Sequence, residues 1–345
     1  MSGIEVVEIA RGAFRAQFLN LGATLHRLEV PDRHGRPDNV VLGYADLEDY
    51  RRQPPRYYGA VAGRYANRIA GGRFALDGET FQLTTNEGDN SLHSGPAGFD
   101  QQLWTVESRS DTAVTFRLDT PHGWNGFPGD LTARVEYVLE EDGLAVRFTA
   151  TTDRATIVNL TQHAYFNLAG EGSSATILEH VLQIPASAIT PVDNELIPTG
   201  ALAPVEGTPF DFRTPKPIGR DIDAADAQLA LGTGFDHNFV LDGPAGFERR
   251  IATLFDPHTG RVLDVHSTEP GVQFYSGNYL ADGAPGTTGG TYPLRGGLCL
   301  EPQKFPDSPN QPGFPSARIE AGETYRHSMA FRFRTASHTE TAFDR

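Results

Sequence analysis

The chain has 345 residues, with 44 acidic side chains against 29 basic ones and a formal net charge of −15. A chain this acidic lacks the clustered Lys and Arg that bind a nucleic-acid backbone, so we expect no nucleic-acid partner. Hydrophobic residues make up 39%, enough for a sizeable core, while 37 glycines and 24 prolines favour many short strands over long helices.

Signals for secretion or membrane insertion are missing from the sequence. Residues 1–14 lack the charged and apolar segments of a signal peptide, and no apolar run approaches the ~20 residues that cross a bilayer. Cys299 is the single cysteine, so no internal disulfide can form. We therefore expect a cytoplasmic protein with no membrane contact.

Apolar and polar residues alternate with a period of two along much of the chain, which is typical of half-buried strands. The clearest runs cover residues 14–18, 114–118, 131–139, 144–150 and 325–333. The turn-forming residues 140–143 join two of these runs and predict a β-hairpin. Helical periodicity is confined to residues 46–52 and 220–230, each long enough for two or three turns.

No linker, composition shift or repeat divides the sequence. Strands spread from one end to the other predict a single all-β domain over residues 1–345, built as a large antiparallel β-sandwich. The last ten residues, 336–345, are expected to form a frayed tail.

Motifs that would hold a cofactor are absent from the sequence: it has no GxxxxGK[ST], HExxH, CxxC or GxSxG. Residues 170–175, "GEGSSA", match a loose dinucleotide fingerprint, but a strand and a proline-broken loop follow where the fingerprint requires a helix. We therefore expect no cofactor and no metal.

Five polar segments interrupt the apolar alternation. They contain Asn67 and Arg68, then His93, then His163, then Asp236 and His237, and finally Gln273 and Glu301. Amides, guanidinium groups and carboxylates bind hydroxyls, and aromatic residues nearby can pack on the apolar faces of a pyranose. Histidine and glutamate can exchange protons near neutral pH. The segments together predict a site for a neutral sugar.

The chain resembles the aldose 1-epimerases, also called galactose mutarotases. The resemblance begins with "LGATLHRLEVPDRHG" and "NVVLGYADLEDY", passes through all five polar segments in order, and ends near "YRHSMAFRF". One departure is Ser94, where the family more often has glycine. The resemblance implies a β-sandwich of the galactose mutarotase-like type and a cofactor-independent interconversion of the α and β anomers of free aldohexoses such as D-glucose and D-galactose.

The resemblance also implies roles for individual residues. Glu301 would be the base and His163 the acid, while His93 would assist at the ring oxygen or bind a hydroxyl. The sugar hydroxyls would be held by Asn67, Arg68, Asp236 and Gln273. We expect a bell-shaped pH–rate curve, with Glu301 setting the acid limb and His163, its pKa raised by Asp236, setting the alkaline limb.

Other interpretations remain open at this stage. A non-catalytic sugar-binding module would have no need of both Glu301 and His163. A metal-dependent isomerase could use His163, Asp236 and Glu301 as ligands, and a glycoside hydrolase could use the two carboxylates but would leave His163 without a task. Each polar residue could instead be structural, as we expect for His237 and His327. The preferred aldose is open, and we expect a monomer or a weak homodimer.

Overall fold

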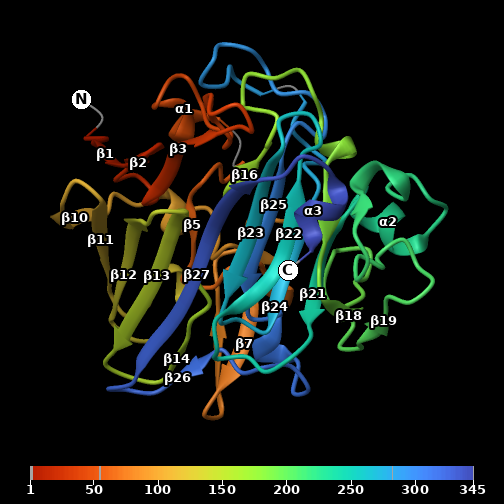
Figure 1. Ribbon diagram of the computed structural model, residues 1–345. Helices are drawn as coiled ribbons and strands as arrows, with labels where there is room; N and C mark the ends of the chain where they lie inside the picture. The colour runs from red at the N-terminus through yellow and green to blue at the C-terminus, as the bar shows by residue number, and fades with distance from the viewer. Residues whose placement is uncertain (1–2, 54–55, 282, 345) are drawn as a thin grey trace.

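The computed structural model describes residues 3–53, 56–281 and 283–344 (Figure 1). Its largest sheet has nine antiparallel strands in the order β10-β11-β12-β13-β27-β23-β22-β17-β20. Their bounds are Thr105–Arg109, Ala113–Thr120, Leu131–Leu139, Gly143–Thr152, Thr324–Thr335, Arg261–Ser267, Arg249–Phe255, Val181–Gln183 and Lys216–Pro217. The predicted hairpin is confirmed, because β12 and β13 pair from Leu131↔Thr152 to Leu139↔Leu144.

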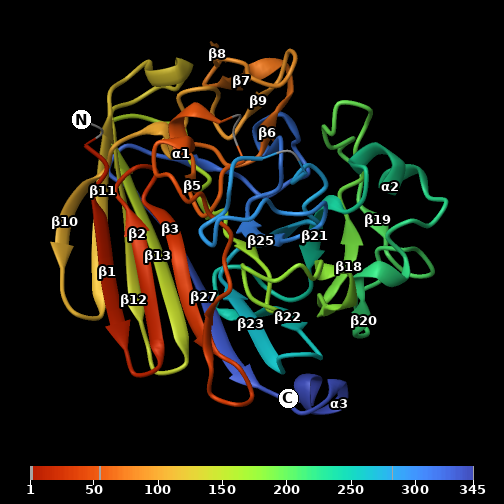
Figure 2. The same ribbon diagram turned by 90° about the horizontal axis from the view of Figure 1, so that it is seen from above.

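Two further sheets cover this one. The four-stranded sheet consists of β1 (Val6–Arg11), β2 (Phe14–Leu19), β3 (Thr24–Pro31) and β4 (Pro37–Asn39). The six-stranded sheet has the order β16 (Tyr165–Phe166), β25 (Leu298–Gln303), β24 (Gly271–Tyr275), β21 (Asp236–Leu241), β18 (Ala186–Ile189) and β19 (Ala203–Pro204). Figure 2 shows β1–β3 beside β11–β13, with β25, β21 and β18 on the other side of β27.

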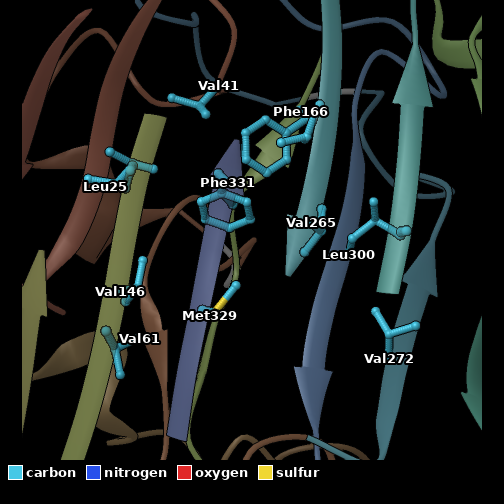
Figure 3. Packing of buried hydrophobic residues seen from close by; sticks show 14 of the residues in the cluster. Leu25, Val41, Val61, Val146, Phe166, Val265, Val272, Leu300, Met329 and Phe331 are labelled. Carbon is cyan, nitrogen blue, oxygen red and sulfur yellow. The ribbon is translucent and has the colours of Figure 1, made fainter. Parts of the chain in front are cut away.

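One hydrophobic core joins the three sheets. The ring centroids of Phe18 on β2 and Tyr137 on β12 lie 4.4 Å apart, and those of Phe166 on β16 and Phe331 on β27 lie 4.9 Å apart. Figure 3 shows the second contact, with Val265 and Leu300 packed beside it. The predicted all-β antiparallel sandwich is confirmed, since each large sheet buries its apolar face against another sheet.

Short strand pairs form separate two-stranded sheets. They are β5 (Val61–Ala62) with β15 (Thr161–Gln162), β6 (Arg68–Ile69) with β9 (Ser91–Leu92), β7 (Arg73–Leu76) with β8 (Glu79–Gln82), and β14 (Thr156–Ile157) with β26 (Arg318–Ile319). The pairs β5–β15 and β6–β9 bring together segments that are far apart in the sequence and that carry predicted site residues.

The described helices are shorter than predicted. The segment 46–52 contains only α1 (Asp49–Arg52), and 220–230 contains the start of α2 (Ala227–Gly232). The helix α2 begins late because the side chain of Asp226 accepts hydrogen bonds from the backbone N–H groups of Gln228 and Leu229 and so caps it there. None of the helices in the described part of the chain has the length and apolar character to cross a bilayer.

The expected frayed tail is wrong for residues 336–344. Residues Thr339–Phe343 form α3, beside β22 (Figure 2). Ala342 is fully buried in a small apolar cluster with Phe255 and Val262, and its carbonyl accepts a 2.5 Å hydrogen bond from Arg334 Nη2. Apolar burial and this bond hold the segment in place. Residue 345 lies outside the described residues.

Candidate active site

One pocket of about 210 Å³ brings together all seven predicted site residues. It is lined by Arg56, Tyr57, Asn67, Arg68, Glu87, Leu92, His93, His163, Tyr165, Asp236, Gln273, Tyr275, Tyr279 and Glu301. Three of the predicted residues, Asp236, Gln273 and Glu301, stand on strands of the six-stranded sheet, where pairing with neighbouring strands fixes the backbone.

Strand β25 supplies Glu301 to this pocket. Leu298 and Leu300 belong to the core, so the alternating residues Cys299, Glu301 and Gln303 occupy the opposite face. Glu301 is directly paired with Gln273 on β24. Asp236, at the start of β21, is paired with Tyr275, two residues along β24 from Gln273. The sheet therefore presents two carboxyl groups and an amide on one face.

His163 lies between β15 and β16 and faces Glu301. Its Nε2 is 3.6 Å from Glu301 Oε2, beyond the usual range of a hydrogen bond. The two residues are only 5% and 2% exposed, and Oε2 has no hydrogen-bond partner among the described residues. The Nδ1 atom of His163 lies 3.5 Å from the Sγ atom of Cys299. The structure thus places an imidazole and a carboxyl group side by side, each with an edge available to a ligand.

Burial shifts the proton affinities of both groups. Burial lowers the pKa of His163 to about 4, because the charged imidazolium loses its hydration. Burial and, next, the negative charge of Asp236 raise the pKa of Glu301 well above its ordinary value. The expectation that Asp236 raises the pKa of His163 is wrong: loss of hydration dominates at the imidazole, and the charge of Asp236 acts on Glu301 instead.

His93 is held in one neutral form. Its Nδ1 accepts a 3.0 Å hydrogen bond from the backbone N–H of Asn67, so the ring proton of the neutral imidazole is on Nε2. Burial, followed by the nearby His163 and Arg68, lowers the pKa of His93 well below its usual value. His93 is therefore suited to donate a hydrogen bond from Nε2 and unsuited to take up a second ring proton.

The same hydrogen bond bears on metal binding. In the described part of the chain, His93, His163 and Glu301 place ligand atoms within 4.8 Å of one another, and Asp236 is not part of this group. A metal needs a nitrogen lone pair, but on His93 the Nδ1 lone pair already accepts the N–H of Asn67 and Nε2 carries the proton. This donor set therefore fits a divalent metal poorly.

Two pocket loops have left-handed backbone. The φ angles are 68° at Asn67, 50° at His93 and 75° at Ser94. Ser94 is buried, and its Oγ accepts a hydrogen bond from the N–H of Tyr65 at 2.8 Å. A residue at φ 75° is a position where glycine is unstrained, so serine accepts backbone strain here.

Charged and amide side chains also line the pocket. Arg68 donates from Nε and Nη2 to the two carboxylate oxygens of Glu87, at 2.6 and 2.8 Å. Its Nη1 lies 3.9 Å from Asp236 Oδ2. The other oxygen of Asp236 accepts a 2.7 Å hydrogen bond from Gln273 Nε2. Burial raises the pKa of Asp236, while Arg68 and Gln273 act in the opposite direction.

Several lining residues were missed from the sequence. Aromatic rings surround the two histidines: the centroid of Tyr57 lies 4.5 Å from that of His93, and Tyr165 lies 5.2 Å from His163. Glu87, Leu92, Tyr165, Tyr275 and Tyr279 lie in the polar segments, so the search for nearby aromatic and acidic residues could have found them. Arg56 and Tyr57 lie outside every segment, and no sequence signal marks them.

Two further histidines are structural, as predicted. His237 is buried, and its ring bonds to Gln228 and to the N–H of Asp236. His327 is also buried, and its two ring nitrogens bond to Ser267 Oγ and to the carbonyl of Leu160. Neither lines the pocket.

Comparison with known proteins places the chain in a family. Residues 5–332 match the family model described as Aldose 1-epimerase. Galactose mutarotase from Bos taurus is 45% identical over 333 residues, which are 96% of this chain and 95% of that protein. This chain belongs to the aldose 1-epimerase family. Aldose 1-epimerase from Escherichia coli (strain K12) is 39% identical over 318 residues, 91% of this chain and 90% of that protein.

Solved structures agree with this family. A GalM/aldose epimerase homologue from C. elegans superimposes with a TM-score of 0.88 at 29% identity, over 97% of this chain and all of that one (100%). A galactose 1-epimerase from Lactobacillus acidophilus gives 0.82 at 27% identity, over 96% and 99%. The predicted fold and the predicted enzyme class, an aldose 1-epimerase and hence an isomerase, are confirmed for this family member.

Proposed function

We propose that the protein interconverts the α and β anomers of free aldohexoses such as D-glucose and D-galactose, with Glu301 and His163 as base and acid. The observation that carries this proposal is their 3.6 Å separation inside a buried, polar pocket. Proton transfer by positioned side chains requires both groups to be within reach of the reacting atoms.

The reaction needs two proton movements in each direction. Glu301 removes the proton from the C1 hydroxyl while His163 protonates the ring oxygen, and the bond between C1 and the ring oxygen breaks to give the open aldehyde. Rotation about the C1–C2 bond presents the other carbonyl face. The ring then closes with the proton movements reversed, so the protein ends in its starting state.

One shared proton suffices for this cycle. The pKa shifts favour a protonated Glu301 and a neutral His163, whereas ring opening requires the carboxylate and the imidazolium. The two arrangements hold the same number of protons, so the pair behaves as one titrating unit. A proton moves within the pair, and the pH of the solution does not change the balance between the two arrangements.

The remaining pocket residues would bind the sugar. The N–H of His93 Nε2 would donate to the ring oxygen or a hydroxyl, and Arg68 Nη1 and Asp236 would bind hydroxyls. Asn67 and Gln273 would add amide groups. The rings of Tyr57, Tyr165, Tyr275 and Tyr279 line the pocket and could pack on the apolar faces of a pyranose.

The protein's setting is part of the same proposal. A single cysteine and a net charge of −15 support a cytoplasmic protein without nucleic-acid or membrane partners. We propose a single domain that acts as a monomer or a weak homodimer, without a cofactor.

Polarimetry tests the proposal directly. Fresh α-D-glucose or α-D-galactose should reach its equilibrium rotation faster with the purified protein than in buffer alone. A protein that binds either sugar but leaves both rates at the spontaneous value would contradict catalysis and favour a binding module.

A further inference from the structure

Within the described part of the chain, the guanidinium of Arg68 is hydrogen-bonded along one edge only. Glu87 accepts from Nε and Nη2 in a two-point contact of 2.6 and 2.8 Å, the geometry in which carboxylates bind arginine most strongly. Among the described residues none accepts a hydrogen bond from Nη1, which faces Asp236 across the pocket at 3.9 Å. The side chain of Arg68 is only 7% exposed, so its orientation governs which of its N–H groups a ligand meets.

The turn that carries Glu87 is itself fixed. Asn90 donates its backbone N–H to the carbonyl of Glu87 at 3.0 Å. The side chain of Asn90 accepts from the N–H of Gly71 at 2.9 Å and donates to Glu195 at 3.0 Å. Gly71 follows β6, the strand that carries Arg68. The glutamate and the arginine are therefore tied to one local frame.

Asp236 competes with Glu87 for the same guanidinium. At 3.9 Å, Nη1 and Oδ2 form an ion pair that is longer than a hydrogen bond. A buried arginine that lost its two-point partner would move toward the remaining carboxylate, because an unpaired buried charge is strongly disfavoured. That movement would close the gap and use up hydrogen-bonding groups on both Arg68 and Asp236.

We propose that Glu87 is a positioning residue that holds Arg68 away from Asp236, so that both remain available to sugar hydroxyls. The inference rests on the proposed site, in which Arg68 and Asp236 bind the substrate. Glu87 acts through Arg68 on substrate affinity and has no part in the proton transfers, which occur at Glu301 and His163.

A matched control exists on the protein surface. Arg134 donates from Nε and Nη2 to Glu107 at 2.7 and 2.9 Å, nearly the geometry of the Arg68–Glu87 pair. The side chains of Glu87 and Glu107 are similarly exposed, at 37% and 34%. Glu107 lies on β10, at the edge of the nine-stranded sheet and outside the pocket. Glu107→Gln therefore removes a two-point contact of similar geometry, to a more exposed arginine, without touching the site.

The experiment compares Glu87→Gln, Glu87→Asp, Arg68→Ala and Glu107→Gln. For each we would measure kcat, KM and the inhibition constant of 1,5-anhydro-D-glucitol, which lacks the anomeric hydroxyl and cannot react. We expect Glu87→Gln to raise KM and the inhibition constant by about 10-fold to 100-fold, the scale of a hydrogen bond to a charged group, with kcat within about threefold. Glu87→Asp, which keeps a carboxylate, should give a smaller increase, and Glu107→Gln should match the wild type.

Each outcome has one meaning. If Arg68→Ala weakens binding and both Glu87 variants bind like the wild type, the positioning role is overturned while the site stands. If Arg68→Ala also leaves binding unchanged, the proposed sugar site fails and the inference fails with it. A Glu87→Gln protein with normal binding but reduced kcat, or one whose only change is a lower Tm equal to that of Glu107→Gln, overturns the inference as well. Should Glu87→Gln not fold, Glu87→Asp decides between the same outcomes.

Discussion

Strands β12 and β25 alternate apolar and polar residues with the same period, yet the two polar faces have opposite surroundings. On β12 buried apolar residues alternate with half-buried residues, which are polar except for Val138. Glu136, for example, bonds to the partly exposed Arg147 at 2.8 Å. On β25 all six residues are buried, and Glu301 faces the pocket.

The difference shows what period two does and does not predict. It identifies a strand with two unlike faces, whichever face meets water. On β12 the second face is solvent, where a glutamate side chain keeps its hydration and an arginine partner. On β25 it is a pocket, where burial raises the pKa of Glu301 and makes the carboxyl group chemically useful.

The largest effect should come from replacing Glu301 with glutamine, with the same change at Glu136 as the control. Glu301→Gln keeps the shape of the side chain and removes the proposed base, so kcat should fall by roughly 10²–10⁴ with folding retained. The matched change Glu136→Gln breaks a surface ion pair worth at most about 1 kcal/mol and should leave kcat unchanged. Polarimetric turnover and circular dichroism check both variants. Near-normal turnover in Glu301→Gln would remove this residue from the mechanism.

His163→Asn should lower kcat by roughly 10²-fold or more and change the pH profile in a specific way. In the wild type, kcat/KM should fall as the pH drops through about 4. There His163 becomes protonated while Glu301 still holds its own proton, so the pair carries two protons. It should also fall at high pH, where Glu301, with its raised pKa, loses the last proton. The variant should therefore lose the acid limb, the reverse of the assignment expected from the sequence. Loss of the alkaline limb alone would contradict these shifts.

A substitution on the apolar face of β25 should lower the stability of the protein and leave its turnover unchanged. Leu300 is 1% exposed and lies in the core, next to Glu301 in sequence but on the opposite face of the strand. Leu300→Ala should lower the free energy of unfolding by about 2–5 kcal/mol because it leaves a cavity. Urea denaturation measures this loss. Turnover per folded molecule should stay near that of the wild type, and a tenfold loss at low temperature would show that the two faces are coupled.

Removal of divalent metal ions with a chelator should have no effect on the activity, the smallest change of this series. The proton on Nε2 of His93 and the bond from Asn67 to Nδ1 leave that ring without a lone pair for a metal. Activity should survive prolonged treatment with a chelator followed by dialysis. An inactive dialysed enzyme that a divalent metal restores would require His93 to change its tautomer and would support a metal-dependent isomerase.

Much of the fold and the membership of the pocket could be predicted from the sequence. The alternation of apolar and polar residues predicts strands such as β12, because one face of the strand is buried. The polar segments predict which residues, although distant along the chain, belong to one site. Glu87 could not be paired with Arg68 in this way, since a glutamate in a turn has no periodic context. The helix α3 was also not predicted from the sequence, because a single buried alanine, Ala342, anchors it.

The proton affinities could not be predicted for a different reason. The sequence places Asp236 and His163 in the same site, which suggested a raised imidazole pKa. The outcome depends on burial and on which carboxyl group each charge faces, and both are properties of the three-dimensional arrangement. Because Asp236 is paired with Gln273 and faces Arg68, its charge is partly neutralised, and loss of hydration decides at His163.

At Asn67 and His93, where the backbone is left-handed, stability and activity favour different residues. Each such residue costs roughly 1–3 kcal/mol relative to a relaxed conformation, and glycine would remove that strain at either position. Glycine would also delete a side chain that the proposed sugar site uses. Adaptation to heat alone would therefore favour substitutions that erode turnover, a trade-off between stability and activity. Laboratory evolution of this enzyme toward thermostability should screen for catalysis in every round.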